Sequence, residues 1–301
     1  MLRAALIALT AAFFIAMLAY AASFRRSFLG IPEAPDPVPC PDLAFLCRRQ
    51  LWSINGFCAS PPQCACYHFV VRTLLRSELH LQILAGFTAL GLALTANTMS
   101  PVTHLHTLLA GKVPSEDVLS APFILSFCMV AGVRFAFEIP ADLRANWVFR
   151  FWLEREGYRA RTTARYVLLV FSVGWLAPLA FLATLAFWGW TIATLHAAIL
   201  VLSTSVLAEI SLLRFRKLPC TCSYPPFQSY SGLVVVAYWF GFIFFTGYLV
   251  EFERWSLFDP WRVLAFGLLG GLAMAAVRHY RRHMLMMDKE LLFEELQVAT
   301  F

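Results

Sequence analysis

Long uncharged apolar stretches recur along this chain, and they constrain its fold more than any other feature. An α-helix rises 1.5 Å per residue, so about 20 apolar residues cross the roughly 30 Å hydrocarbon core of a membrane. Stretches of about this length cover residues 4–22, 81–98, 119–137, 166–188, 191–213, 232–250 and 263–277. Lipid offers no hydrogen bonds, so each stretch is expected to satisfy its backbone as a helix. The sequence predicts an all-α polytopic membrane protein with about seven transmembrane helices in a single domain, residues 1–301.

Three places in this pattern depend on a further choice. Residues 166–213 are too long for one span, and Trp188-Gly189-Trp190 is the best turn, because glycine adopts turn conformations and tryptophan favours the membrane interface. Residues 263–277 are short for a span. The first stretch follows Arg3 and ends near Ala19-Tyr20-Ala21, so its alternative is a signal peptide whose cleavage would leave six spans.

The composition fits a chain that faces lipid. The 301 residues are 60% hydrophobic and 14% charged, whereas soluble domains are about half apolar and a quarter charged. The net charge is +6, but the basic residues lie between the apolar stretches and not on one soluble module. They fit the anionic surface of a lipid bilayer better than a nucleic acid, which we exclude as a partner.

The basic residues also predict an orientation. Of the 24 Lys and Arg residues, 20 fall in the segments 24–80, 134–165, 214–229 and 278–301, and 4 fall in the rest of the chain. Loops rich in Lys and Arg stay in the cytoplasm. We therefore expect a bacterial inner-membrane protein with an outside N-terminus, a cytoplasmic loop 24–80 and a cytoplasmic C-terminus. Cleavage of the first span would put the 20 residues outside, so we favour its retention.

Three of the predicted cytoplasmic segments are amphipathic: residues 67–80, 141–165 and the tail from Arg278. In the first, Val70 and Leu74 oppose Arg72 and Arg76 at helical spacing. Such helices lie in the headgroup plane with the apolar side down. The alternative is that one of them docks a soluble partner such as an ATPase.

Charged residues inside spans are the first candidates for a functional site, because they are costly in a membrane. Arg134 and Glu138 are four residues apart and are expected to pair on one helical face. Glu209 lies at similar depth, so we predict one intramembrane charge cluster of all three. It is either structural pairing or a substrate or proton path through Glu209. For His196 we favour a hydrogen-bonded packing role over a ligand role.

The cysteines suggest a different chemistry. Cys64 and Cys66 fall in the first predicted cytoplasmic loop, and Cys220 and Cys222 fall in the third. Two such pairs are compatible with a four-thiolate zinc or iron–sulfur site. The alternative is reduced thiols in a reducing cytosol, which needs no cofactor, and we expect none.

Small residues recur every four positions in two spans. Gly267, Gly271 and Ala275 share one face of the last span, and Ala85, Ala89 and Ala93 share one face of the second. Helices approach closely across such faces, so both are predicted to pack against neighbouring helices.

Four segments of the chain resemble a group of bacterial multispanning, permease-like membrane proteins with no established activity. They are residues 67–77 (YHFVVRTLLRS), 139–150 (IPADLRANWVFR), 218–224 (LPCTCSY) and the tail 291–296 (LLFEEL). The resemblance covers most of the chain. It implies that the chain corresponds to the C-terminal part of longer members.

The sequence has no nucleotide-binding, zinc-protease or serine-hydrolase motif, so we expect no enzymatic activity in this chain itself. The leading hypothesis is a permease-type subunit of a transport system with a separate ATPase. The alternatives are a membrane scaffold or assembly factor, and a metal or redox sensor that uses the cysteines. The expected partners are the lipid bilayer and a cytoplasmic ATPase or another membrane subunit.

Overall fold

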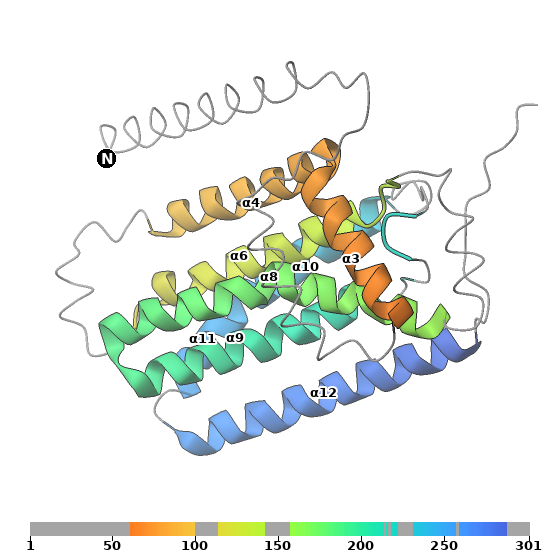
Figure 1. Ribbon diagram of the computed structural model, residues 1–301. Coiled ribbons are helices and arrows are strands. Elements are labelled where there is room, and N and C mark those ends of the chain that lie inside the picture. Colours follow the sequence, from red (N-terminus) through yellow and green to blue (C-terminus); the bar gives the residue numbers. More distant parts are fainter. Residues whose placement is uncertain are drawn as a thin grey trace, which may run out of the picture. The chain divides into compact units, whose positions relative to one another are not determined.

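The structure is a computed structural model that describes residues 61–99, 114–141, 157–213, 215, 218–221, 231–256 and 259–287. Within these residues the chain forms helices and no strand. Helices α3 (Pro61–Arg76), α4 (Glu78–Met99), α6 (Glu116–Ala136) and α8 (Gly157–Trp188) come first. They are followed by α9 (Trp190–Ser211), α10 (Ser231–Ile243), the π-helical segment η2 (Phe244–Tyr248), α11 (Leu249–Ser256) and α12 (Pro260–Met287). In Figure 1 the long helices run alongside one another and α3 crosses one end of them.

Five of these helices are long and apolar enough to cross a membrane: Glu78–Met99, Glu116–Ala136, Thr162–Trp188, Trp190–Ser211 and Trp261–Met284. They correspond to five predicted spans, which confirms an all-helical fold suited to a membrane. The predicted span 4–22 lies outside the described residues. Residues 232–250 fall in α10, η2 and α11, none of which reaches span length alone. The count of about seven therefore stays a prediction.

The predicted turn between the fourth and fifth spans is confirmed at Gly189. This residue joins α8 to α9 with a φ of 84°, in the left-handed region that favours glycine. A Cβ atom placed there would have nothing within 4 Å, so the requirement is conformational and not steric. The two helices form a hairpin with a one-residue connection.

The last helix is longer than its predicted span. It runs from Pro260 to Met287, whereas the apolar pattern ends at Val277, before Arg278. Arg278 and Arg281 continue the helix because both contact the carboxylate of Glu209 on α9. The neighbouring charge allows the helix to continue where hydropathy alone predicts its end.

The helices pack closely at glycines other than the predicted ones. A Cβ atom on Gly270 would lie 2.6 Å from Leu202, and one on Gly132 would lie 2.7 Å from Phe87. Gly267 and Gly271 have nothing within 4 Å of that position, and Ala275 is exposed. The predicted face therefore does not contact another described helix. It lies about 100° around α12 from the packing face, because neighbouring residues differ by that rotation.

The second small-residue face is also exposed. Ala85, Ala89 and Ala93 are exposed, and the close approach of α4 to α6 is made at Gly91, where a Cβ atom would lie 3.1 Å from Cys128. The four-residue spacing predicts a flat face but not the side of the helix on which the partner lies.

The amphipathic segment predicted at 67–80 is helical, but it divides between two helices. Helix α3 begins at Pro61, in keeping with the preference of proline for the first turn, and α4 begins at Glu78. Val70 and Leu74 are buried and Arg72 and Arg76 are exposed, as predicted. The apolar side packs on protein, however, since α3 contacts α8 and α4. Gln63 Nε2 donates to Thr162 Oγ1 at 3.0 Å, which ties α3 to the start of α8.

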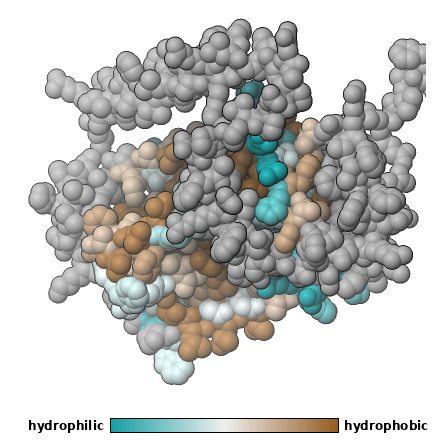
Figure 2. Space-filling model, in the orientation of Figure 1, coloured by the Kyte–Doolittle hydropathy of each residue, from teal (hydrophilic) through white to brown (hydrophobic). Residues whose placement is uncertain are grey.

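The core lies between α6, α8, α9 and the η2–α11 segment. Its buried residues are Leu119, Phe123, Phe127, Val173, Ala180, Ile199, Leu200, Phe245 and Val250. The outside is also apolar: Figure 2 shows hydrophobic side chains over much of the described face, and large exposed residues include Phe240, Trp239 and Trp261. A surface of this kind suits contact with lipid.

Candidate functional site

A buried histidine–glutamate pair joins α9 to α11. His196 Nδ1 and Glu253 Oε1 lie 2.8 Å apart, and both side chains are 0% exposed. Both residues belong to helices whose faces line the apolar core. Ionisable groups inside a membrane protein are rare and usually functional, so this pair is the strongest candidate site of the described residues.

The surroundings of the pair are aromatic. The ring of Phe123 meets that of His196 edge-on with centroids 5.7 Å apart, and it meets the ring of Phe245 in the same way at 5.7 Å. Such a setting has few dipoles that solvate a charge. Removal of either partner would therefore leave a buried polar or charged group without its contact, which is costly.

Each partner has one further buried polar atom that the contact between them does not use. His196 Nε2 and Glu253 Oε2 have no hydrogen-bond partner among the described residues. An imidazole nitrogen or a carboxyl oxygen accepts a hydrogen bond when it carries no proton and donates one when it is protonated. The two atoms therefore suit a small polar molecule that both donates and accepts hydrogen bonds, or a proton in transit between them.

The π-helical segment η2 sets the direction of Glu253. It lies directly before α11, and its wider turn adds about one residue to the helical path. Each residue added to a helix rotates the residues that follow it by about 100° around the helix axis. Without η2, Glu253 would therefore point about 100° away from the side on which His196 lies. Segments of this kind are frequent at functional sites.

An open hollow lies on the other side of α11. It has a volume of about 910 Å³, and its charged lining residues are Glu116, Glu251, Arg254 and Arg262. Arg254 pairs with Glu116, and Arg262 lies over the ring of Trp255 at 3.3 Å from its centroid. The short α11 thus contributes Arg254 to the hollow and the neighbouring Glu253 to the core.

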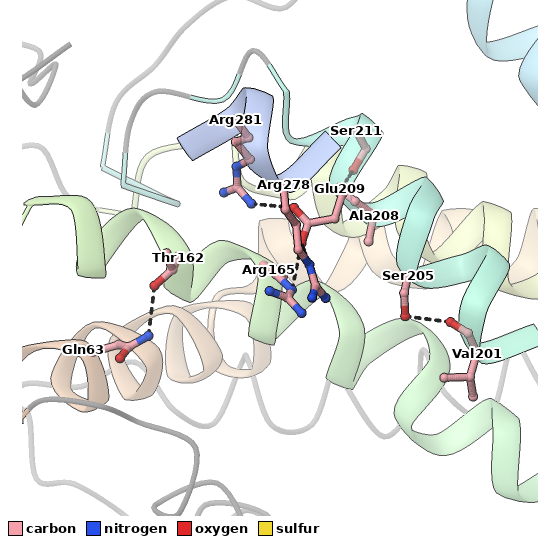
Figure 3. A network of polar contacts seen from close by, with 10 residues as sticks. All are labelled: Gln63, Thr162, Arg165, Val201, Ser205, Ala208, Glu209, Ser211, Arg278 and Arg281. Carbon is pink, nitrogen blue, oxygen red and sulfur yellow. Dashed lines mark hydrogen bonds and ion pairs between the residues drawn. The ribbon is translucent and has the colours of Figure 1, made fainter. Parts of the chain in front are cut away.

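Glu209 forms a second charged site at the opposite ends of α9 and α12. Its carboxylate is 1% exposed and accepts from Arg278 Nε at 3.2 Å and from Arg281 Nη1 at 3.0 Å. Arg165 Nε on α8 lies 2.9 Å from the Oε1 atom that Arg278 also contacts, without the alignment of a hydrogen bond. Figure 3 shows the three arginines converging on the carboxylate from two helices. We call Glu209, Arg165, Arg278 and Arg281 the arginine cluster.

The predicted cluster of Arg134, Glu138 and Glu209 is divided in the structure. Arg134 pairs with Glu138, as their spacing indicates, and its Nε donates to Ser211 O at 3.1 Å. Its guanidinium also lies over the ring of Phe215, 4.7 Å from the centroid. Arg134 therefore binds the end of α9, whereas Glu209 pairs with the three arginines of the arginine cluster. The difference arises because α12 extends far enough to bring its own arginines to Glu209.

The cysteines do not form a metal site within the described residues. Cys64 is half-buried and Cys66 and Cys220 are buried, while Cys222 lies outside the described residues. The described part of the chain contains no group of three or more His, Cys, Asp or Glu residues placed to hold a metal ion. Burial raises the pKa of the Cys66 thiol to about 12. A protonated thiol is a poor metal ligand and a poor nucleophile.

Cys220 has a structural role in the backbone. Its φ is 62°, and its amide donates to Phe137 O at 3.1 Å while its carbonyl accepts from Ala141 at 2.9 Å. These two bonds hold residues 218–221 against the end of α6. Positive φ is uncommon outside glycine, so this backbone is held by its contacts.

The sequence analysis does not predict a role for Glu253, because this residue follows the predicted span 232–250. The one signal is its charge so soon after an apolar stretch, which is not specific. Comparison with protein-family models, with curated proteins and with solved structures returned no match.

Proposed function

We propose that the chain is a permease-type membrane subunit of a transport system whose ATPase is a separate chain. The observation that carries this proposal is the fully buried His196–Glu253 pair, with one polar atom of each partner directed at no described group. Breaking a buried pair is strongly destabilising, and replacing both partners by apolar residues is often neutral or stabilising. Retention of a pair at this cost is best explained by a task for its protons or its open atoms.

The position of the pair supports the same proposal. Helix α11 is the wall between the pair and the open hollow of about 910 Å³. A small movement of this short segment would open the pair to the hollow. Irregular helix at membrane depth is tolerated where it is buried in protein or lines a cavity, and η2 and α11 fit that description.

The ATPase is proposed as a separate chain because this sequence lacks a nucleotide-binding loop. Helix α3 offers it a surface, since Arg72 and Arg76 are exposed at the end of the bundle where the arginine cluster also lies. Positive charge at this end supports its assignment to the cytoplasm of a bacterial inner membrane, with the C-terminus inside and the N-terminus outside. On this proposal the chain itself catalyses no reaction.

Two measurements test the proposal. Gentle purification of the full chain from its native membrane is expected to recover a nucleotide-binding subunit. Vesicles from cells that make the wild-type chain or Glu253→Gln are then compared for the solutes that they accumulate with ATP. We expect at least one solute to be lost from the Glu253→Gln vesicles.

The control is Glu78→Gln, because Glu78 is exposed at the start of α4 and does not line the hollow. Unchanged accumulation in Glu78→Gln and loss in Glu253→Gln would support the proposal. Recovery of a stoichiometric partner that is not an ATPase, together with identical solute profiles for both variants, would overturn it.

A scaffold or assembly factor is the second candidate, and the exposure of α4 and α12 favours it. In their most apolar windows only 17% and 6% of the residues are buried, against 61% for α6. These two helices have wide faces for a second membrane protein. Cross-linking from Leu92 and Leu268, both exposed, would capture one protein partner in a scaffold and only lipid in a subunit without such a partner.

A further inference from the structure

We propose that the arginine cluster binds the phosphate of an anionic phospholipid headgroup, through Arg165 and Arg278. These two arginines come from different helices and meet at one carboxylate oxygen, Glu209 Oε1. Two guanidinium groups at one oxygen repel each other, and a further negative charge nearby would offset that repulsion. A third arginine, Arg281, already occupies Glu209 Oε2 at 3.0 Å. The described cluster therefore brings three arginines to one carboxylate.

The geometry leaves suitable donors. Arg165 and Arg278 each contact Glu209 through Nε, and their described polar contacts do not use the four terminal Nη atoms. A guanidinium offers five N–H donors in a planar fork, which fits a phosphate better than any other side chain does. Figure 3 shows both guanidinium groups beside the carboxylate, with their terminal nitrogens directed away from it.

The exposure of the two residues makes the site reachable. The side chains of Arg278 and Arg165 are 43% and 25% exposed, whereas Glu209 is 1% exposed. The buried carboxylate thus orients two arginines that remain open to the outside. It acts as a positioning residue, and the arginines are the binding groups.

The lipid, and not a dissolved phosphate, is favoured by what lies next to the cluster. Helix α12 exposes Leu268, Leu269 and Leu272 on the turns before Arg278, and α9 exposes Ile210 beside Glu209. This apolar surface suits acyl chains, and the arginines stand where the apolar length of α12 ends, which is the depth of a headgroup. Basic pockets between membrane helices bind anionic headgroups by this combination of charge and apolar wall.

The test uses the full chain, purified in detergent and stripped of lipid, with dioleoyl phosphatidylglycerol as the probe. Native mass spectrometry is expected to find one retained phosphatidylglycerol per chain, with phosphatidylcholine retained much more weakly. Arg278→Gln should weaken retention about tenfold, the loss expected for one charge-assisted hydrogen bond. Retention by Arg278→Lys should lie between that of the wild-type chain and that of Arg278→Gln, because lysine keeps the positive charge without the planar fork of donors.

The matched control is Arg262→Gln, on the same helix at its other end. Equal retention in Arg278→Gln and Arg262→Gln would overturn the proposal, and so would equal retention of phosphatidylcholine. Inorganic phosphate is the third arm: if it raises the unfolding temperature as much as phosphatidylglycerol does, the site takes a dissolved anion and the lipid proposal is wrong. Because Arg278 is partly exposed, its variants are expected to fold, which circular dichroism checks. The outcome is independent of whether the chain transports a solute.

Discussion

The two ends of α9 carry one buried glutamate contact each, and they solve the same electrostatic problem in different ways. At one end Glu253 meets a single histidine, and the pair is 0% exposed. At the other end Glu209 meets three arginines, two of which reach the outside. Histidine can lose its proton and arginine cannot, so only the first site has a basic partner that can change its charge. The first site is therefore suited to movement of a proton, and the second is suited to a fixed anchor.

The largest expected effect separates the two glutamates. Glu209→Gln would leave three permanent positive charges together, and we expect a loss of about 3 kcal/mol in the free energy of unfolding. This is the low end of the range for buried pairs, because Arg278 is 43% exposed and can turn to water. Denaturant unfolding in detergent measures it. A loss smaller than that of Glu253→Gln would break the comparison.

The packing between α9 and α12 should matter at the arginine end alone. Gly270→Val would place its side chain against Leu202, and we expect it to cost about 1–3 kcal/mol. It would also move Arg278 away from Glu209 and so weaken retention of phosphatidylglycerol. Gly271→Val is the control, since nothing lies within 4 Å of its Cβ position. Similar unfolding curves for both variants would contradict the packing described for Gly270.

Glu253→Gln should cost less, at about 1 kcal/mol. The amide oxygen of glutamine still accepts from His196 Nδ1, and the histidine can remain neutral, so no charge is left without a partner. The variant is therefore expected to fold while it loses the protonatable carboxyl. Denaturant unfolding of Glu253→Gln and Glu209→Gln under the same conditions compares the two losses in unfolding free energy directly. A loss of about 3 kcal/mol or more in the free energy of unfolding, as large as that expected for Glu209→Gln, would mean that the pair is charged and mainly structural.

A smaller effect is expected from salt, which should change the cost of a substitution at the arginine cluster but not at the His196–Glu253 pair. Arg278→Gln is expected to cost at most about 1 kcal/mol at low salt, as partly exposed ion pairs do. At about 1 M salt the Debye length falls to about 3 Å, and most of that cost should disappear. The cost of Glu253→Gln should stay the same, because the pair is fully buried. Equal salt dependence for both variants would show that water reaches both sites.

The smallest effect concerns the thiols of α3, beside the arginine end. Burial raises the pKa of Cys66 from 9.0 to about 12, so its thiol is protonated near neutral pH and its alkylation should be slow until the pH approaches 12. The unfolded chain loses this proton first, so the contribution of Cys66 to stability falls as the pH rises from 9 to 12. In single-cysteine variants, maleimide should label half-buried Cys64 faster than Cys66 at pH 8. Faster labelling of Cys66 would place it at the surface.

The sequence predicted the helices well because hydropathy and helix length are local properties. Five spans and the turn at Gly189 follow from apolar runs and one glycine. The faces were not predictable in the same way. Gly270 and Gly271 differ by one position, and only the arrangement of α9 decides that Gly270 is the one in contact.

The charged sites show the same limit. Arg134 and Glu138 were paired correctly because both lie on one helix, four residues apart. Two partners of Glu209, Arg278 and Arg281, lie 69 and 72 residues later in the chain, and the chain order contains no sign of these contacts. The His196–Glu253 pair depends in addition on the register change at η2, which apolar periodicity does not report.

The one-residue connection at Gly189 has a consequence for how the protein enters its membrane. Arg165 near the start of α8 and Glu209 near the end of α9 touch, so the hairpin returns the chain to the side from which it came. The two helices are therefore an insertion unit that is neutral for topology. When both helices cross the membrane, the hairpin leaves the sidedness of the helices that follow unchanged.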